Sequence, residues 1–437
     1  MNLEAKKRRD RVIIWAIYIM YLPCFLAGLD NYNYIVNNST SIDLLYRVVG
    51  ARMMMDGKSP YRYQWKAGGE EAIRYYHPIP RYSQSINGVT VTPAVLWLHQ
   101  PVANADFCQV SRMWFGVELA LVFLSGLLLL IICQGWQQKL LALLTLTCFF
   151  VFGRNLYLHL HSAQLYLVYA FVFILLYFIL SSGITHKYII AGVLVAVAAW
   201  LKPFFVLLVV PFLFRRNRKL ITGFAVMAVV LALHAILMGH TGYWIEYASA
   251  MKEYANDVFL RDHPDFLRIY PPPFTVSDCV YPLRQPERFP LTASGLAPVQ
   301  YYLQRVGIEI KNTSVFFIAA TLVAVGISAL TRHIKDLPRL MTILFLVYLS
   351  AELLAPVPRP GYYLVQWMLP AVLVITNYRR NIAAAVLMVA GLFINNGLLP
   401  VIGVHSGSLG EGLMILALLL FILQRGRQDE ASQAVAE

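Results

Sequence analysis

The sequence is poor in charge, in cysteine and in nucleotide-binding motifs, and each shortage excludes a class of protein. Charged residues make up 14% of the 437 residues and hydrophobic residues 59%, which is too little charge for a soluble protein of this length. The five cysteines form no metal-binding or redox motif. The sequence has no Walker loop, dinucleotide fingerprint or internal repeat, which argues against ATP-driven transport and inverted-repeat transporter folds.

Long apolar runs occupy much of the sequence, whose mean hydropathy is +0.59. Only helices and closed barrels can span a bilayer, and continuous apolar runs of about 20 residues predict helices. Twelve such runs are candidate spans: residues 12–29, 113–133, 138–152, 164–182, 188–200, 203–214, 220–239, 313–331, 339–354, 362–377, 381–398 and 408–424. The sequence therefore predicts an all-α polytopic membrane protein of about twelve transmembrane helices, with residues 1–437 forming a single integral membrane domain.

The fifth and sixth runs could form one long helix, and the distribution of basic residues decides against it. If the chain breaks at Lys202 and Pro203, the basic stretches all fall on the side of the amino terminus, as the positive-inside rule requires. These stretches are residues 6–11, 187, 215–219, 332–339, 379–380 and 425–427. We therefore predict two short helices with Lys202 at their outer turn, a break that is tolerated only where the backbone lines a protein cavity.

This topology places both termini in the cytoplasm and two large segments outside, residues 30–112 and 240–312. The first span has a basic flank like that of a signal peptide, but no small-residue cleavage site follows Cys24, which favours a retained anchor. The formal net charge of +13 lies mostly in short cytoplasmic loops, so membrane lipids explain it better than nucleic acid. Cys108 and Cys279 both fall outside, where they could pair in an oxidising compartment.

The stretch from Asp43 to Tyr61 predicts a short amphipathic surface helix that stops at Gly57 and Pro60. A carboxylate at the membrane surface is costly unless it is used, although an Asp there also suits a helix N-cap. Lys202 is a cation inside an apolar hairpin, where it requires an anion. We expect short surface helices in residues 30–100 and 241–256 to cover a cavity at the outer leaflet.

Five segments, in this order, resemble glycosyltransferase family 87. They are Asp43 with Gly57 and Tyr61, then residues 91–101 (VTPAVLWLHQP), 158–166 (LHLHSAQLY), 191–203 (AGVLVAVAAWLKP) and 355–363 (APVPRPGYY). The family comprises type C, polyprenyl-phosphate-sugar-dependent enzymes, including polyprenyl-phosphomannose-dependent mannosyltransferases. The sequence departs from its pattern in three places. Thr92 replaces the first residue of a Tyr-Pro-Pro, Ala163 replaces a Gly, and Tyr362 and Tyr363 stand where histidines are expected.

The resemblance implies a type C glycosyltransferase-like fold and an enzyme that transfers a sugar, mannose by family default, from a polyprenyl-phosphate donor to a glycan or glycolipid acceptor. It makes Asp43 the general base of an inverting reaction, with no metal or other cofactor. Candidate contacts to the donor phosphate are Lys202, Arg359, Arg47, Arg52, His159 and His161. Candidate residues of the substrate cavity are Gln164, Tyr46, Tyr61, Tyr362 and Tyr363. The expected location is the bacterial inner membrane, with the site on the periplasmic or extracellular side.

The change at Tyr362 and Tyr363 leaves open whether Arg359, or His159 and His161, contact the phosphate. Two other functions are also compatible with parts of the sequence. A transporter or flippase of lipid-linked sugars would need a similar cation-lined cavity. A non-catalytic scaffold would leave Asp43 and Lys202 without a purpose. The large outer segments favour the enzyme, because an acceptor site must be built outside the bilayer.

Overall fold

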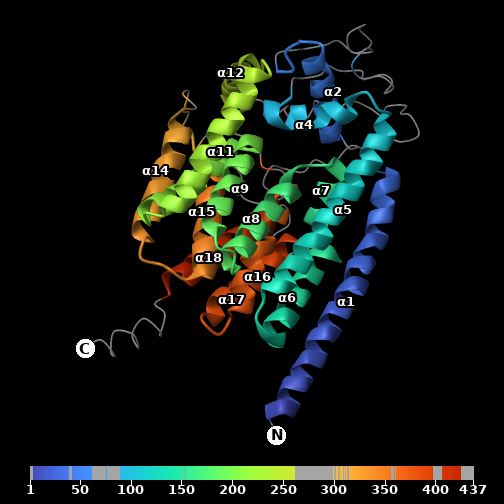
Figure 1. Ribbon diagram of the computed structural model, residues 1–437, viewed down its shortest axis with the longest axis vertical. Coiled ribbons are helices and arrows are strands. Elements are labelled where there is room, and N and C mark those ends of the chain that lie inside the picture. The colour runs from blue at the N-terminus through green and yellow to red at the C-terminus, as the bar shows by residue number, and fades with distance from the viewer. Residues whose placement is uncertain are drawn as a thin grey trace.

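A computed structural model of the chain describes residues 3–38, 42–61, 75, 89–151, 153–260, 299, 302–303, 306–308, 310, 312, 314–355, 359, 361–396 and 406–424. The regular elements of these residues are helices (Figure 1). The first half contains α1 (Leu3–Asn38), α2 (Ile42–Met55), α4 (Pro93–Ala103), α5 (Phe107–Ile132), α6 (Gly135–Phe150), α7 (Arg154–Ser162), α8 (Tyr166–Ser181), α9 (Lys187–Leu201), the 3₁₀ helix η1 (Pro203–Leu208) and α10 (Val209–Phe214). The second half contains α11 (Arg218–Leu237), α12 (Thr241–Leu260), α14 (Ser314–Leu330), α15 (Leu337–Leu354), the 3₁₀ helix η3 (Gly361–Trp367), α16 (Met368–Thr376), α17 (Ile382–Asn395) and α18 (Ser406–Leu423).

Among the described residues, four helices are long and apolar enough to cross a membrane: α5, α11, α15 and the part of α1 from Glu4 to Gly28. A fifth span results if α6 and α7, which meet at a bend of 55°, are counted together. The other expected spans correspond to apolar helices of 10–17 residues. The all-helical membrane architecture is therefore confirmed, whereas the number of twelve spans is not.

The predicted break at Lys202 is confirmed. Helix α9 ends at Leu201, Lys202 adopts an extended conformation with φ −144° and ψ 108°, and Pro203 opens η1. A helix end buried in apolar surroundings leaves carbonyl groups that need donors. The hydroxyl of Thr92, the N-cap residue of α4, donates to the carbonyls of Trp200 (3.1 Å) and Leu201 (3.2 Å). A side chain from another part of the chain thus supplies hydrogen bonds to the last carbonyl groups of α9.

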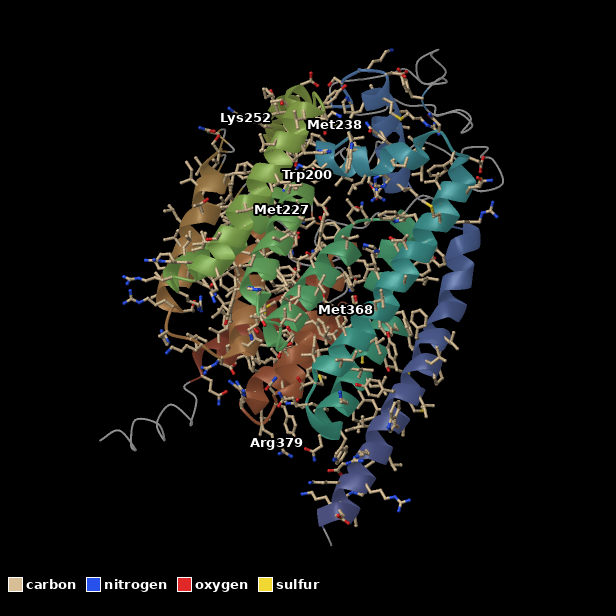
Figure 2. The ribbon with its side chains drawn as sticks, viewed as in Figure 1. Trp200, Met227, Met238, Lys252, Met368 and Arg379 are labelled. Atoms are coloured by element: carbon tan, nitrogen blue, oxygen red, sulfur yellow. The ribbon has the colours of Figure 1, made fainter. Side chains whose placement is uncertain are left out.

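The basic loops gather at one end of the bundle. Arg215, after α10, donates to the carbonyl of Thr331, after α14 (2.9 Å). Arg380, between α16 and α17, pairs with Asp336 at the start of α15 (2.7 Å). Figure 2 places Arg379 at the same end as the amino terminus of α1. Helices α2, α4 and α12 lie at the opposite end (Figure 1), so the basic loops and the expected surface helices are separated as the charge pattern predicted.

Helix α2 is the surface helix expected from the sequence. It ends at Met55, and Gly57 follows with φ +70°, a left-handed conformation that glycine adopts without steric cost. The amides of Gly57 and Lys58 donate to the carbonyls of Met54 (3.1 Å) and Met53 (2.9 Å), which closes the helix end. The two expected surface-helix regions contain α2, α4 and α12.

Close helix contacts at small residues hold the membrane region together, as is common between membrane helices. Gly192 on α9 lies against the backbone of α11, where an added Cβ would be 2.1 Å from the carbonyl oxygen of Leu220. Gly223 on α11 meets the backbone of Ile189 on α9 in the same way. Helices α8, α15 and α16 form the centre of the core, and every residue of α16 is buried.

Cys108 is disulfide-bonded, whereas Cys24, Cys133 and Cys148 are free thiols. Cys279 lies outside the described residues. The pairing of Cys108 with Cys279 therefore stays a prediction. Non-reducing mass spectrometry of peptides from the intact protein would test it directly.

Candidate functional site

Asp43 lies in the first turn of α2, at the end of the bundle away from the basic loops. Its carboxylate accepts a hydrogen bond from the side chain of Gln164, which joins α7 to α8, and faces the guanidinium of Arg47 one turn further along α2. Burial raises the pKa of Asp43 to about 6, although Arg47 and the hydrogen bond from Gln164 lower it. A carboxylate with this pKa can accept a proton near neutral pH. The structure thus brings together three of the residues singled out in the sequence.

Arg47 anchors α2 to the membrane helices. Its side chain is 2% exposed. Nε donates to the carbonyl of Asp43 (3.1 Å), Nη2 donates to the carbonyl of Ala163, and the guanidinium lies 4.5 Å from the ring centroid of Trp114 on α5. These contacts hold the helix that carries Asp43 against α5 and the end of α7.

Ala163, one of the departures from the family pattern, ends α7 in the left-handed conformation with φ 53° and ψ 52°. Left-handed geometry costs an L-residue with a Cβ about 1–2 kcal/mol, whereas glycine adopts it freely. The structure therefore gives a physical reason for a glycine at this position. The same left-handed turn directs the Ala163 carbonyl toward Arg47, which donates a hydrogen bond to it.

A buried polar cluster beneath Arg47 contains two groups that the sequence analysis did not select, Glu118 on α5 and His99 on α4. His159 on α7 is fully buried, and its Nδ1 lies 3.4 Å from Oε1 of Glu118, while its Nε2 accepts the backbone N–H of Leu167 (3.0 Å). Nδ1 of His99 donates to the carbonyl of Val95 (2.7 Å). Burial, and secondarily the charge of Arg47, lowers the pKa of His99 to about 3.

His159 is therefore engaged inside the protein, and its expected contact with a donor phosphate gains no support from this geometry. His161 follows His159 by two residues on α7, so it points to a different face of the helix, and it stacks with Tyr157, with ring centroids 6.2 Å apart. Arg52 donates to the carbonyls of Ala103 (2.6 Å) and Tyr75 (2.6 Å). These bonds link α2 to two neighbouring segments, so Arg52 has a structural role in addition to any contact with substrate.

The candidate cavity tyrosines lie in different places. Tyr46 packs against the apolar cluster around Met54 and Tyr61. The Tyr61 ring packs at a tilt against that of Tyr247 on α12, with ring centroids 5.6 Å apart, and its buried hydroxyl has no hydrogen-bond partner among the described residues. Tyr46 and Tyr61 therefore contribute to one apolar cluster, which α12 also joins. The side chain of Tyr362 lies outside the described residues.

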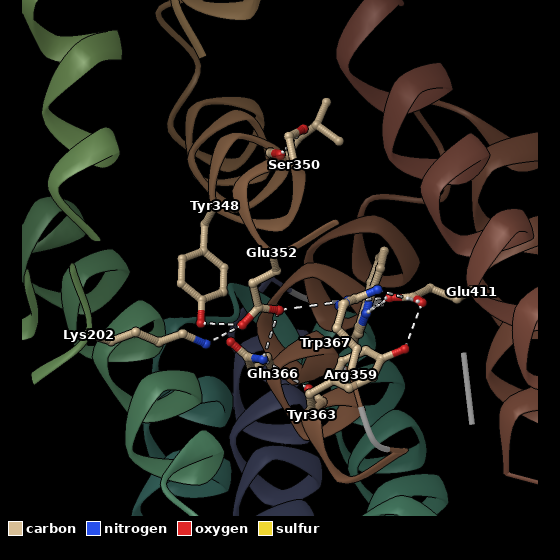
Figure 3. Close-up of polar contacts among 10 residues, drawn as sticks. Lys202, Tyr348, Ser350, Glu352, Arg359, Tyr363, Gln366, Trp367 and Glu411 are labelled. Carbon is tan, nitrogen blue, oxygen red and sulfur yellow. Dashed lines mark hydrogen bonds and ion pairs between the residues drawn. The ribbon is translucent and has the colours of Figure 1, made fainter. Parts of the chain in front are cut away.

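Lys202, at the break after α9, makes an ion pair with Glu352 of α15 (Figure 3). The carboxylate of Glu352 also accepts from the Tyr348 hydroxyl (2.8 Å) and lies 3.7 Å from the Arg359 guanidinium. Gln366 of η3 donates to the same carboxylate (3.5 Å). The anion that Lys202 was expected to require is thus supplied by the chain itself.

Arg359 links the Lys202–Glu352 pair to Glu411 on α18. Its guanidinium makes two bonds to the carboxylate of Glu411 (3.0 and 3.3 Å) and lies 3.9 Å from the ring centroid of Tyr363. The Tyr363 hydroxyl and the Trp367 Nε1 donate to Glu411 as well (2.9 and 3.3 Å) (Figure 3). Tyr363 therefore belongs to the charged cluster, in which two cations, Lys202 and Arg359, alternate with two carboxylates.

The two polar clusters meet at the start of α8. The ring of Tyr166 lies 4.4 Å from the Lys202 ammonium, and the Tyr166 hydroxyl interacts electrostatically with Glu352 and with Asp43. Tyr169, one turn later, lies 4.9 Å from the Lys202 ammonium and interacts with Arg47. A proton acceptor, Asp43, and two cations, Lys202 and Arg359, thus all interact with Tyr166. Such an arrangement can take a proton from one group while it stabilises negative charge on another.

Among the described residues, no group of three or more His, Cys, Asp and Glu side chains is arranged to hold a metal ion. The Glu118–His159 pair has two such groups, and the Lys202 cluster offers carboxylates that are already bonded to cations.

Comparison with known proteins gives one match. No curated protein and no solved structure matches the chain. The model of glycosyltransferase family 87 matches residues 90–266, a region that runs from α4 to α12 and includes His159, Gln164 and Lys202. This match supports a membrane glycosyltransferase, which uses a sugar donor and an acceptor. Over residues 90–266 the chain is therefore similar to glycosyltransferase family 87, in agreement with the resemblance of its sequence motifs.

Proposed function

We propose that the protein transfers a sugar from a polyprenyl-phosphate donor to a hydroxyl of a glycan or glycolipid acceptor, with Asp43 as the general base. The observation that carries this proposal is the position of Tyr166, whose ring contacts Lys202 and whose hydroxyl interacts with Asp43. Because Tyr166 contacts Lys202 and lies within electrostatic range of Asp43, a donor phosphate near Lys202 would place its sugar toward Asp43.

The proposed reaction is an inverting displacement. The acceptor oxygen attacks the anomeric carbon, and its proton passes to the carboxylate of Asp43. The bond between the anomeric carbon and the phosphate oxygen breaks, and its electron pair stays on the polyprenyl phosphate. Lys202 and Arg359 would stabilise the charge that builds on this leaving group.

Lys202 makes an ion pair with Glu352. A bound donor phosphate therefore has to share Lys202 with Glu352 or take the place of Glu352 beside it. Glu352 would keep the Tyr348 hydroxyl, the Gln366 amide and the Arg359 guanidinium if Lys202 turned to the phosphate. The exchange therefore leaves no buried carboxylate without a partner, which limits its cost.

Mannose is the proposed sugar because it is the family default. We propose the outer face of the bacterial inner membrane as the location, with both termini cytoplasmic. The gathering of Arg215, Arg379 and Arg380 at the end of the bundle opposite α2 supports this orientation.

The test compares the wild type with Asp43→Asn in two assays on purified protein: sugar transfer from a panel of polyprenyl-phosphate sugars, and translocation of the same lipids across vesicles without acceptor. Asn keeps the size of Asp and caps a helix about as well, but it cannot take the proton. We expect transfer to fall about 10²- to 10⁴-fold and donor binding to survive. Asp106→Asn is the matched control, because Asp106 is a helix N-cap that accepts from the Gln109 amide.

Retained transfer by Asp43→Asn would contradict the catalytic role. Acceptor-independent translocation by the wild type would favour the alternative, a transporter or flippase of lipid-linked sugars. The Lys202–Glu352–Arg359–Glu411 cluster gives that alternative its physical basis, since charged residues between membrane helices often mark a substrate pathway.

A further inference from the structure

Helix α12 carries an aromatic surface that the proposed mechanism does not use. Tyr243, Trp244 and Tyr247 lie close together on this helix, which is at the same end of the bundle as α2 and α4 (Figure 1). The Tyr247 ring centroid lies 5.6 Å from that of Tyr61 and 6.1 Å from that of Trp244. The Tyr243 hydroxyl donates to the carbonyl of Met54 on α2 (3.4 Å). Aromatic rings thus gather between α12 and the end of α2.

Two buried polar atoms of this surface have no hydrogen-bond partner among the described residues. They are the hydroxyl of Tyr61, a residue that is 6% exposed, and Oε2 of Glu246 on α12. The two groups lie within electrostatic range of one another, but they do not bond to each other. A buried polar atom without a partner costs stability, and Phe or Leu would pack here without that cost. The pair therefore indicates a site whose polar atoms are satisfied by a ligand.

The chemistry of these groups selects an uncharged ring that carries hydroxyl groups. A tyrosine hydroxyl donates and a carboxylate accepts, so the hydroxyl groups of one ligand can bond to both Tyr61 and Glu246. Aromatic side chains around a few polar groups are typical of a small-molecule site. The electrostatic partners of Tyr61 among the described residues are Tyr247, Glu246 and Tyr243. A phosphate would therefore find no counterion here, whereas a neutral sugar ring needs none.

Tyr46 connects this surface with the proposed general base. It follows Asp43 by three residues on α2, which places the two side chains on the same face of the helix. The Tyr46 ring packs against the apolar cluster that contains Tyr61 and is joined by Tyr243 and Tyr247. A sugar bound between α2 and α12 would therefore lie about one helix turn from Asp43.

We propose that Tyr61, Glu246 and Tyr247 bind an uncharged sugar ring of the acceptor, with its hydroxyl groups bonded to the Tyr61 hydroxyl and the Glu246 carboxylate. The assignment deepens the proposed function and rests on it. Neither α2 nor α12 is among the apolar helices of the described chain, whereas Lys202, assigned to the donor phosphate, follows the apolar helix α9. The acceptor sugar would thus reach Asp43 from the side of α12, and the lipid-linked donor from the membrane helices.

Sugar binding can be measured without donor or transfer. Saturation-transfer-difference NMR is recorded on the purified protein in phospholipid nanodiscs. The probes are the neutral methyl glycosides of mannose, glucose and galactose, with mannose 6-phosphate as the anionic comparison. We expect at least one neutral glycoside to bind, with its strongest signals on ring C–H protons, and the phosphate to bind more weakly. Binding by none of the neutral glycosides would overturn the inference.

Two substitutions test the two polar atoms. Tyr61→Phe removes only the hydroxyl and should weaken the affinity for the bound glycoside about three- to tenfold. Glu246→Met removes the carboxylate and should weaken it about tenfold or more. Because the Tyr61 hydroxyl has no hydrogen-bond partner among the described residues, Tyr61→Phe should leave the unfolding temperature unchanged or higher. Its loss of affinity is then separate from any loss of folding.

Tyr21→Phe is the matched control for Tyr61→Phe. The Tyr21 hydroxyl, on α1, donates to the carbonyl of Phe123 on α5 (2.7 Å), so its removal should lower the unfolding temperature and leave the glycoside affinity unchanged. Lys252→Met changes an exposed charge on α12 (Figure 2) and should also leave the affinity unchanged. Wild-type affinity in both folded Tyr61→Phe and folded Glu246→Met would overturn the inference.

Transfer kinetics distinguish an acceptor sugar from a donor sugar at this site. With saturating donor, both substitutions should raise the KM for the acceptor, while the affinity for the polyprenyl-phosphate sugar stays at its wild-type value. Loss of donor affinity with an unchanged acceptor KM would place the donor sugar here and overturn the inference. If the wild type transferred no sugar from any donor but bound a glycoside through Tyr61 and Glu246, the sugar-binding site would stand and the enzymatic proposal would fall.

Discussion

The Lys202 ammonium is bonded to the Glu352 carboxylate, 150 positions later in the sequence. Loss of one partner from a buried ion pair costs about 3–5 kcal/mol when the other is left as an unpaired charge. Because Glu352 keeps the Tyr348 hydroxyl, the Gln366 amide and the Arg359 guanidinium, we expect Lys202→Met to lower the free energy of unfolding by less than this. The double variant Lys202→Met with Glu352→Gln should recover much of it, as thermal unfolding in detergent would measure.

Donor binding distinguishes the two roles of Lys202. If the ammonium contacts the donor phosphate, affinity for a polyprenyl-phosphate sugar should stay low in the double variant although its stability is recovered. Recovery of donor affinity together with stability would instead assign Lys202 a structural role only.

The pH dependence of the sugar-transfer rate should follow the titration of the Asp43 carboxyl group. Its pKa of about 6 is raised chiefly by burial, and only the ionised carboxylate accepts a proton. The rate should therefore be at its plateau above about pH 7 and fall about tenfold per pH unit below 6. His99 remains neutral through this range because its pKa is about 3. An acid limb that persists unchanged in the residual activity of Asp43→Asn would assign the titration to another group.

The contact between α9 and α11 should not tolerate a larger residue at Gly192. An added Cβ would approach the Leu220 carbonyl oxygen to 2.1 Å, so Gly192→Ala forces the helices apart and should destabilise the protein by about 1–3 kcal/mol. Gly326 on α14 provides the control, since a Cβ there meets nothing within 4 Å. Gly326→Ala should be neutral or stabilising in the same unfolding assay. Equal effects of the two substitutions would contradict the close packing.

The membrane topology can be tested by cysteine labelling of intact cells with a membrane-impermeant reagent. Asn217→Cys lies beside Arg215, at the basic end of the bundle, and Leu260→Cys lies at the end of α12. Position 217 should be inaccessible from outside intact cells, and position 260 should be labelled. The reverse pattern at both positions would invert the proposed orientation and move the Asp43 site to the cytoplasmic side.

Local features of the fold, such as helix ends and breaks, could be predicted from the sequence because each depends on only a few neighbouring residues. The break at Lys202 followed from Pro203 and the charge pattern, and the end of α2 followed from Gly57. The number of full spans was less readable, because bends and 3₁₀ turns shorten apolar helices. Helices α6 and α7 meet at a bend of 55°, and hydropathy does not encode such a bend.

The site was only partly predictable for a related reason. Asp43, Gln164 and Lys202 belong to segments with recognisable motifs, whereas Glu118 and Glu411 are single acids within apolar stretches. A signal for both existed, since an ionisable residue in a membrane helix marks a possible functional site. Their partners, His159 and Arg359, come from distant segments, and a single sequence gives no indication of such pairings.

The hydroxyl of Thr92 restrains the motions that could admit substrates. It holds the last carbonyls of α9, immediately before Lys202, so lifting α4 away would expose polar backbone groups in an apolar setting. A hinged lid built on α4 is thus disfavoured by the hydrogen bonds beneath it. A long lipid-linked substrate would then reach Lys202 by sliding sideways between membrane helices, and the rate of that lateral entry would depend on the fluidity and thickness of the bilayer.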